Sequence, residues 1–190
     1  VFQGLDKIIK QFPFPVVGID SDNGSEFINS HLTRYCEQNR ITFTRARPYR
    51  KNDNCYVEQK NWHIVRKSVG YWRYQTEKEV EIMNELYKAL RLYTNFFQPQ
   101  LKLIEKSRVG SKIVKKYDKA RTPYQRIINC ADVDESIKKE LKLQYQCLNV
   151  VELKTKIIRL QNILYRAVRN NPYYRRLRES KKEKKEYVLG

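Results

Sequence analysis

The first 70 residues combine short β-branched runs with stretches of helical spacing. Residues 16–19 form an apolar run between two prolines and Ser-Asp-Asn-Gly, which predicts a buried strand that ends in a tight turn. A second β-rich run covers residues 41–44, and a polar basic loop then leads into a helix that continues to Gly70. Apolar positions at helical spacing predict a helix between the two runs, and these are Phe27, Ile28, Leu32, Tyr35 and Cys36.

A longer amphipathic helix is predicted to begin at Thr76 and to end at Gln98, because the residue before a proline is disfavoured in a helix. Its apolar positions recur every three or four residues, at Met83, Leu86, Leu90, Tyr93 and Phe97. We expect this stripe to belong to the core and to cover the sheet. Further along, Thr122-Pro123 has the form of a capping residue followed by proline, which predicts another helix start.

The stretch from residue 135 to 170 contains neither glycine nor proline. Its apolar positions form two heptad-like runs whose phase slips near residues 150–151. A single helix of this length would extend about 50 Å at 1.5 Å per residue, which is too long for a small core to cover. The stretch therefore either pairs with another chain or folds back on itself at the slip, and the sequence leaves both alternatives open.

The 190 residues include 39 lysines and arginines against 21 aspartates and glutamates, which gives a net charge of +18. Residues 1–98 carry +4 and residues 99–190 carry +14. This imbalance indicates a polyanionic partner, for which nucleic acid is the usual candidate, with a solubility surface as the alternative. Residues 101–126 are expected to follow a DNA backbone through basic side chains that include Lys112, Lys115 and Lys116, unless they form a solvated linker.

Several classes of protein are disfavoured by what the sequence contains. The four cysteines show no paired spacing, so we expect reduced thiols of a cytosolic protein rather than a zinc site. No run approaches the roughly 20 apolar residues of a membrane span. Residues 171–190 would form a basic tail, and we expect its stretch 175–185, which is rich in lysine, arginine and glutamate, to be disordered.

The candidate chemistry lies where the first predicted strand ends. Asp22 follows this strand, at a position where open α/β sheets usually place ligands, and Gly24 lets a metal or another backbone approach closely. A second carboxylate, Glu58, follows with 35 residues between the two. Asp-Asn-Gly alone is more often a simple turn, so the spacing to Glu58 carries the interpretation. The face of the predicted helix that carries Glu58 also carries Asn61, Trp62 and Val65.

These motifs resemble the last two acidic positions of the DDE triad in the superfamily of retroviral integrases and bacterial insertion-sequence transposases. Residues 21–27 read Ser-Asp-Asn-Gly-Ser-Glu-Phe, and residues 57–61 read Val-Glu-Gln-Lys-Asn. The segments 47–49, 51–53 and 95–99 are similar to the same transposases, so the resemblance covers roughly residues 1–126. It implies an α/β fold, with a partial ribonuclease H-like integrase core followed by a mostly α-helical, basic C-terminal region.

The resemblance also implies a reaction. Asp22 and Glu58 would be catalytic carboxylates that hold two Mg²⁺ or Mn²⁺ ions for DNA strand cleavage and strand transfer in DNA integration or transposition. The partners would be transposon ends and target DNA, with the protein acting as a homo-oligomer in the bacterial cytoplasm and on the nucleoid. The DNA contacts implied around this site are Asn23, Gly24, Arg50, Lys51, Lys60, Asn61 and Arg66.

One departure from the family pattern shapes the expected organisation. The first aspartate of the triad lies several tens of residues before the second, whereas 21 residues precede Asp22 here, so we expect a C-terminal fragment that is inactive alone. Residues 1–98 would be the partial core, 99–134 a basic connector, 135–170 a long helix or helical pair, and 171–190 the tail. The alternatives are a non-catalytic nucleic-acid-binding remnant of a mobile element and a helical interaction protein.

Overall fold

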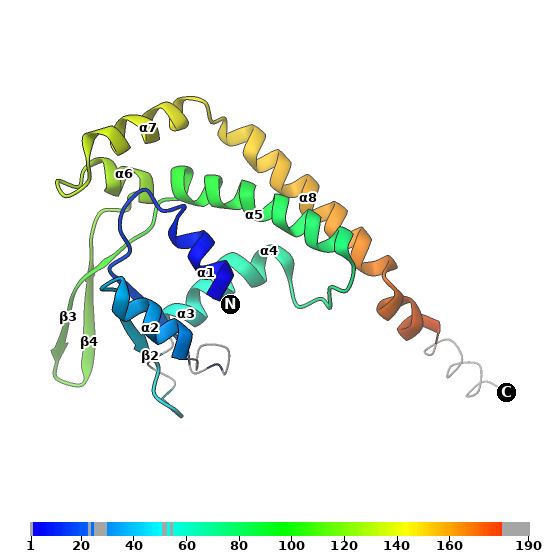
Figure 1. Cartoon of the computed structure of the whole chain (residues 1–190), viewed down its shortest axis with the longest axis horizontal. Helices are drawn as coiled ribbons and strands as arrows, with labels where there is room; N and C mark the ends of the chain where they lie inside the picture. Colours follow the sequence, from blue (N-terminus) through cyan, green and yellow to red (C-terminus); the bar gives the residue numbers. More distant parts are fainter. Residues whose placement is uncertain (1, 23, 25–29, 51–52, 54, 180–190) are drawn as a thin grey trace. The chain divides into compact units, whose positions relative to one another are not determined.

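The computed structural model describes residues 2–22, 24, 30–50, 53 and 55–179 (Figure 1). The protein is a mixed α/β molecule, as the sequence predicted, and it divides into two compact units. Unit 1 comprises Val1–Gly70 and unit 2 comprises Tyr71–Gly190. The division falls after Gly70, whereas the sequence interpretation extended the first domain to residue 98. Within the described residues, no helix is both long and apolar enough to cross a membrane.

Unit 1 is built around a parallel β-α-β arrangement. Strand β1 (Gly18–Ser21) pairs in parallel with β2 (Thr42–Arg45), and helix α2 (Ser30–Gln38) connects them. The buried centre consists of Leu32, Cys36 and Ile41, against which residues of helix α1 (Phe2–Ile9) and both strands pack. This is the strand, helix, strand order that the hydrophobic pattern predicted.

Strand β1 starts later than the sequence predicted. The apolar run began at residue 16, but Val17 is 77% exposed and the strand runs from Gly18 to Ser21. The backbone N–H of Thr42 donates to the Val17 carbonyl at 2.9 Å, so pairing already begins at that carbonyl. The polar residues Asp20 and Ser21 therefore belong to the strand, because ladder hydrogen bonds rather than apolar character define its end.

A continuous helical segment closes unit 1. It consists of α3 (Cys55–Lys60), the π-helical stretch η3 (Asn61–Arg66) and α4 (Lys67–Val69), and it ends at Gly70. The φ of Gly70 is 73°, a conformation that other residues rarely adopt, which explains why the helix stops there. The predicted helix after the basic loop is confirmed, whereas its π-helical stretch had no counterpart in the prediction.

Two long helices form the core of unit 2. Helix α5 (Glu77–Phe97) packs lengthwise against α8 (Val150–Asn170), as Figure 1 shows. Thr76 caps α5 and the helix ends before Gln98, as predicted. The prediction that its apolar stripe covers the sheet is wrong in detail, because the packing partner is α8. The buried side chains along this contact include Leu86, Ala89, Ile157, Leu164 and Val168.

The basic segment after Pro99 is an antiparallel hairpin of β3 (Leu103–Val109) and β4 (Lys112–Tyr117). The turn contains Gly110, whose φ is +60°. We predicted an aperiodic connector here. Apolar residues occur on both faces of this hairpin and both faces are exposed, so the sequence lacks the clean alternation of a half-buried strand.

Residues 135–170 form a helical pair, one of the two arrangements that the sequence left open. Helix α7 (Glu135–Gln146) ends shortly before α8, and Asn149 caps α8 by accepting hydrogen bonds from the backbone N–H groups of Val151 and Glu152. The break thus lies next to the predicted phase slip. Helix α6 (Pro123–Ile128) begins at the Thr122-Pro123 pair, as predicted.

An aromatic cluster joins the C-terminal end of α5 to α6 and α7. The ring of Tyr145 lies 4.7 Å from that of Tyr124 and 5.5 Å from that of Phe97, measured between centroids. Phe96 contacts both tyrosines and is itself buried. These contacts fix the helices that flank the hairpin.

The predicted disordered tail is partly helical. Residues 172–179 form a helix directly after α8, which corrects the expectation of disorder for residues 175–179. Tyr174 anchors it, because its hydroxyl accepts a hydrogen bond from the backbone N–H of Arg73 at 3.0 Å. Residues 180–190 lie outside the described residues.

Candidate functional site

Asp22 lies immediately beyond the end of β1 and is half-buried. Its Oδ1 accepts a hydrogen bond from the backbone N–H of Gly24 at 3.0 Å. This short-range bond is the turn chemistry expected of Asp-x-Gly, and it holds the carboxylate next to the strand end. The structure shows no hydrogen bond from another described residue to the second carboxylate oxygen. The structure thus places Asp22 at the strand end that the sequence indicated.

The neighbouring carboxylate, Asp20, has a structural partner. Asp20 and Thr44 are directly paired across β1 and β2, and the Thr44 hydroxyl donates to Asp20 Oδ1 at 2.8 Å. Such cross-strand polar pairs stabilise the register of a small sheet. Asp22, in contrast, forms no cross-strand hydrogen bond with another described residue.

Glu58 lies in the same compact unit, on α3, and its side chain is exposed. It forms no ion pair with the other residues that the structure describes. A glutamate in the first turn of a helix also interacts favourably with the helix dipole. Glu58 is thus a solvent-accessible carboxylate on a regular, rigid element.

The helix that carries Glu58 changes its hydrogen-bonding pattern one residue after Lys60. From Asn61 to Arg66 it is π-helical, with bonds between residues five apart. The expectation that Asn61, Trp62 and Val65 share the face of Glu58 assumed the period of an α-helix, so it does not hold across this stretch. Short π-helical stretches occur frequently at functional sites. No signal in the sequence predicted this one.

The loop between β2 and α3 is organised by an ion pair. The guanidinium of Arg47 bonds both carboxylate oxygens of Asp53, with distances of 2.7 and 3.0 Å, and its backbone N–H donates to the same carboxylate at 3.2 Å. The side-chain hydrogen bond from Arg47 lowers the pKa of Asp53 to about 2. Tyr49, at the tip of the loop, is exposed and has a positive φ of 61°. Asp53 therefore stabilises the loop through its ion pair with Arg47.

The predicted DNA contacts of unit 1 are distributed over the loop and the helix. Arg50, Lys60 and Asn61 are exposed, and Arg66 is half-buried on η3. Gly24 contributes the N–H bound by Asp22. Asn23 and Lys51 lie outside the described residues. The basic side chains of Arg50 and Lys60 are thus exposed to solvent.

Carboxylate oxygens are the ligands that Mg²⁺ and Mn²⁺ prefer, so Asp22 and Glu58 are suited to such an ion by their chemistry. Within the part of the chain that the structure describes, no three histidine, cysteine, aspartate or glutamate side chains gather in a group that could hold a metal. Asp22 and Glu58 are thus not part of a larger group of this kind among the described residues.

In unit 2, the predicted DNA contacts Lys112, Lys115 and Lys116 are exposed on β4. The base of this hairpin is fixed by Arg126 of α6. Its guanidinium donates to Asp118 Oδ2 at 2.5 Å and to the Gln100 carbonyl at 2.7 Å, while Asp118 Oδ1 accepts from the N–H of Lys102 at 2.6 Å. The hydrogen bond from Arg126 lowers the pKa of Asp118 to about 2. These contacts were not predicted from the sequence.

A buried carboxylate that the sequence did not single out joins α5 to the end of α8. Glu79 is fully buried, and its Oε2 accepts from the backbone N–H groups of Gln75 and Thr76 at 2.6 and 2.9 Å. Its Oε1 accepts from the amide of Asn171 at 2.9 Å. Burial raises the pKa of Glu79, but these hydrogen bonds outweigh it and the pKa is lowered overall. Glu79 is thus an ionised structural group.

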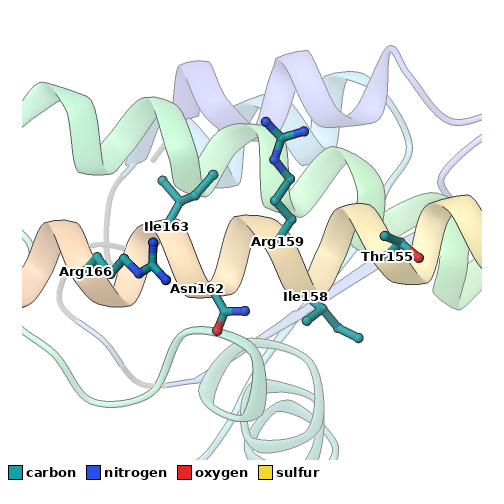
Figure 2. A pocket seen from close by; sticks show the side chains of 6 residues that line it. All are labelled: Thr155, Ile158, Arg159, Asn162, Ile163 and Arg166. Carbon is teal, nitrogen blue, oxygen red and sulfur yellow. The ribbon is translucent and has the colours of Figure 1, made fainter.

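A hollow of about 460 Å³ runs along the side of α8, and Figure 2 shows the side chains that line it. Isoleucine side chains alternate there with basic and neutral polar groups, and the hollow contains neither a carboxylate nor a thiol. The lining residues are Thr155, Ile158, Arg159, Asn162, Ile163 and Arg166. Apart from the Thr155 hydroxyl, this lining offers no group that commonly acts as an acid, base or nucleophile, so it adds no strong candidate to Asp22 and Glu58.

Comparison with known proteins gives one informative similarity. No family model matches the chain, and no solved structure matches it. The chain is 43% identical over 126 residues to a protein of Sinorhizobium fredii (strain NBRC 101917 / NGR234) that is named "Uncharacterized protein y4rM". The aligned region covers 66% of this chain and 36% of the relative, so the chain spans about a third of that protein's length.

Proposed function

We propose that this chain is part of a DDE-type enzyme that cleaves and joins DNA strands with the help of divalent metal ions. One observation carries the proposal. Asp22 follows the first strand of a parallel β-α-β arrangement, and Glu58 follows with 35 residues between the two, on a helix of the same unit. A ribonuclease H-like core is the fold that this arrangement supports best, and residues 1–70 would be its C-terminal portion.

Asp22 and Glu58 would hold the metal, each through a carboxylate oxygen. Mg²⁺ or Mn²⁺, when bound, supplies a positive charge that activates the attacking oxygen and stabilises the leaving one in phosphoryl transfer. The protein's own part is to fix the carboxylates. Gly24 orients Asp22 through its backbone N–H, and α3 holds Glu58 on a regular element. Arg50 and Lys60, both exposed, would position DNA phosphates beside the site.

The partners follow from the same proposal. The DNA would be the ends of a mobile element and its target, and two or more copies of the protein would act together on paired ends. Such an enzyme works in the cytoplasm and associates with the nucleoid when it is bound to DNA. The first carboxylate of the triad would come from a part of the enzyme outside residues 1–190.

Replacement of Mg²⁺ by Fe²⁺ tests whether the two carboxylates bind metal. In the presence of ascorbate and oxygen, bound Fe²⁺ generates hydroxyl radicals that cut the polypeptide close to the ion. We expect cuts near residues 22 and 58, and we expect Asp22→Asn or Glu58→Gln to remove both. Glu37→Gln, which changes an exposed carboxylate on α2, is the matched control and should leave the cuts unchanged. Cuts that remain unchanged in both the Asp22→Asn and the Glu58→Gln variants would contradict the proposal.

Catalysis itself is tested in a completed enzyme that also supplies the first carboxylate of the triad. Glu58→Gln should abolish Mg²⁺-dependent strand transfer, because it removes a proposed metal ligand. DNA affinity should stay nearly unchanged, because the substitution leaves every lysine and arginine in place. A variant that still joined DNA strands would refute the assignment of Glu58. A DNA substrate that already carries a free 3′-hydroxyl needs no prior cleavage, so with it the joining step is measured alone.

Nucleic-acid binding without catalysis is the second candidate function. The exposed basic hairpin of unit 2 favours it, because that surface does not depend on either carboxylate. The two functions differ in a simple outcome. Salt-dependent DNA binding combined with no Fe²⁺-directed cutting at residues 22 and 58 would select the second candidate.

A further inference from the structure

The hairpin of β3 and β4 is exposed on both of its faces. Of the residues in its strands, Ser107 is half-buried and all the others are exposed. A two-stranded hairpin is marginally stable on its own. This one is held at its base by the bonds of Asp118 and Arg126, so the exposed ribbon starts from a fixed point. The two strands are therefore exposed to solvent, while the base of the hairpin is held by hydrogen bonds.

The pairing register assigns the side chains to two faces, because successive residues of a strand point to opposite sides. We call one the basic face, which consists of Leu103, Lys106, Arg108, Ile113, Lys115 and Tyr117. We call the other the mixed face, which consists of Glu105, Ser107, Val109, Lys112, Val114 and Lys116. The basic face carries three cations and no carboxylate. On the mixed face, Glu105 lies directly opposite Lys116.

The basic face contains an unfavourable pair of like charges. Lys106 and Lys115 are directly opposite each other across the two strands. Like charges in that position destabilise a hairpin, and an anion bound between them would relieve the repulsion. Arg108 lies beside the turn, where its Nε donates to the Gly110 carbonyl at 3.2 Å. A guanidinium has five N–H donors, so most of those of Arg108 remain for a ligand.

We propose that this ribbon lies in the major groove of B-form DNA, with its basic face turned into the groove. This inference rests on the proposed function, in which DNA is the partner. The major groove is about 12 Å wide and admits a two-stranded β-ribbon. Lys106 and Lys115, one on each strand, reach the phosphates on the two sides of the groove, and Arg108 reaches the base edges.

A pair of matched double variants tests which face binds. Lys106→Gln with Lys115→Gln, and Lys112→Gln with Lys116→Gln, each remove two charges from the same ribbon but from opposite faces. Binding of a fluorescent 30-base-pair duplex is measured by anisotropy over a range of salt concentrations. Each lost phosphate contact lowers the slope of log affinity against log salt by about 1, so the basic-face variant should lose about 2. At 0.1 M salt its affinity should fall roughly tenfold or more.

Lys112 and Lys116 were predicted from the sequence as DNA contacts alongside Lys115, but the register places them on the opposite face, which points away from the groove. The mixed-face variant should therefore lose less than about 1 in slope. A control outside the ribbon changes Lys78, Lys139 and Lys142 to glutamine, which removes three exposed charges from α5 and α7. Equal losses for the two ribbon variants would refute the assignment of the basic face. Circular dichroism on each variant confirms that the fold is retained.

The groove is tested separately. Methylation of guanine N7, which lies in the major groove, should weaken binding of the unmodified protein, and duplex RNA should compete poorly because its major groove is too deep and narrow. Undiminished binding to the methylated duplex would overturn the major-groove placement.

The outcomes also separate this inference from the function on which it rests. If the unmodified chain shows no salt-dependent DNA binding, the DNA partner itself is wrong. If it binds but the basic-face variant binds equally well, DNA remains the partner and the ribbon proposal alone fails.

Discussion

Two carboxylates, Glu79 of unit 2 and Glu58 of unit 1, lie in contrasting environments. Glu79 of unit 2 is fully buried and accepts hydrogen bonds from two backbone N–H groups and from Asn171. Glu58 of unit 1 is exposed, and Asp22 is half-buried with one local bond from Gly24. A carboxylate whose oxygens are all occupied stabilises the fold, whereas one that faces solvent is available to a ligand. Under the proposed function, Asp22 and Glu58 are the ligand-binding carboxylates, whereas Glu79 is structural.

Removal of Glu79 should have the largest effect on stability. Glu79→Ala leaves buried N–H donors without partners and removes the capping box of α5, so we expect a loss of roughly 2–4 kcal/mol in the free energy of unfolding. Urea denaturation followed by circular dichroism measures it. Glu81→Gln, at an exposed position of the same helix, is the control and should change stability little. A loss as small as that of the control would show that the buried network is not stabilising.

A double-mutant cycle tests whether Glu79 and Asn171 act as a unit. Asn171 is buried, donates to Glu79 and to the Arg73 carbonyl, and accepts from the N–H of Tyr174. Residues within one hydrogen-bond network usually show coupling of about 0.5–3 kcal/mol. We therefore expect Glu79→Ala with Asn171→Ala to be less destabilising than the sum of the single changes. Strict additivity would refute a shared network.

The acid dependence of stability follows from two depressed pKa values. Asp118 and Asp53, paired with Arg126 and Arg47, each have a pKa of about 2 in the folded protein, below the value of about 3.9 in an unfolded chain. Their contribution is therefore fully present above pH 4 and is lost as the pH falls towards 2. Asp118→Asn should flatten this loss in unit 2 and Asp53→Asn in unit 1, as shown by urea midpoints measured between pH 2 and 6. Unchanged profiles in both variants would contradict the assignment.

The two candidate-site carboxylates, half-buried Asp22 and exposed Glu58, should show the smallest effect on stability. Asp22→Asn and Glu58→Gln should each change the free energy of unfolding by about 0.5 kcal/mol or less, as surface substitutions away from structural networks usually do. Thermal and urea denaturation of unit 1 measure the change. A loss of about 2 kcal/mol or more in Glu58→Gln would give this carboxylate a structural role and remove the contrast with Glu79.

Local signals in the sequence predicted much of the fold. Thr76 marked the start of α5, and Thr122-Pro123 marked α6, because a cap satisfies N–H groups only a few residues away. The bond between Glu79 and Asn171 joins positions 92 apart, and no local pattern encodes it. The hairpin was not predicted because neither of its faces is buried, so its apolar and polar residues do not alternate as in a half-buried strand.

The candidate site was only partly readable from the sequence. The position of Asp22 at a strand end followed from the β-branched run and the Asp-Asn-Gly turn, and Glu58 was correctly placed on a helix. The π-helical stretch was not predicted, because its residues have ordinary helical composition. The pairing of Lys106 with Lys115 required the register of the hairpin, which only the folded chain supplies.

The most direct test of the central claim asks whether Asp22 and Glu58 hold the same ion. Mn²⁺ broadens the NMR signals of nearby amides, so a titration of the isotope-labelled chain reports which residues lie close to a bound ion. We predict that amides around residues 22–24 and 57–59 broaden together, and that Glu58→Gln relieves the broadening at both places. If that variant relieves it only on α3 and leaves it unchanged beside Asp22, the two carboxylates do not share a site and the proposed metal centre is wrong.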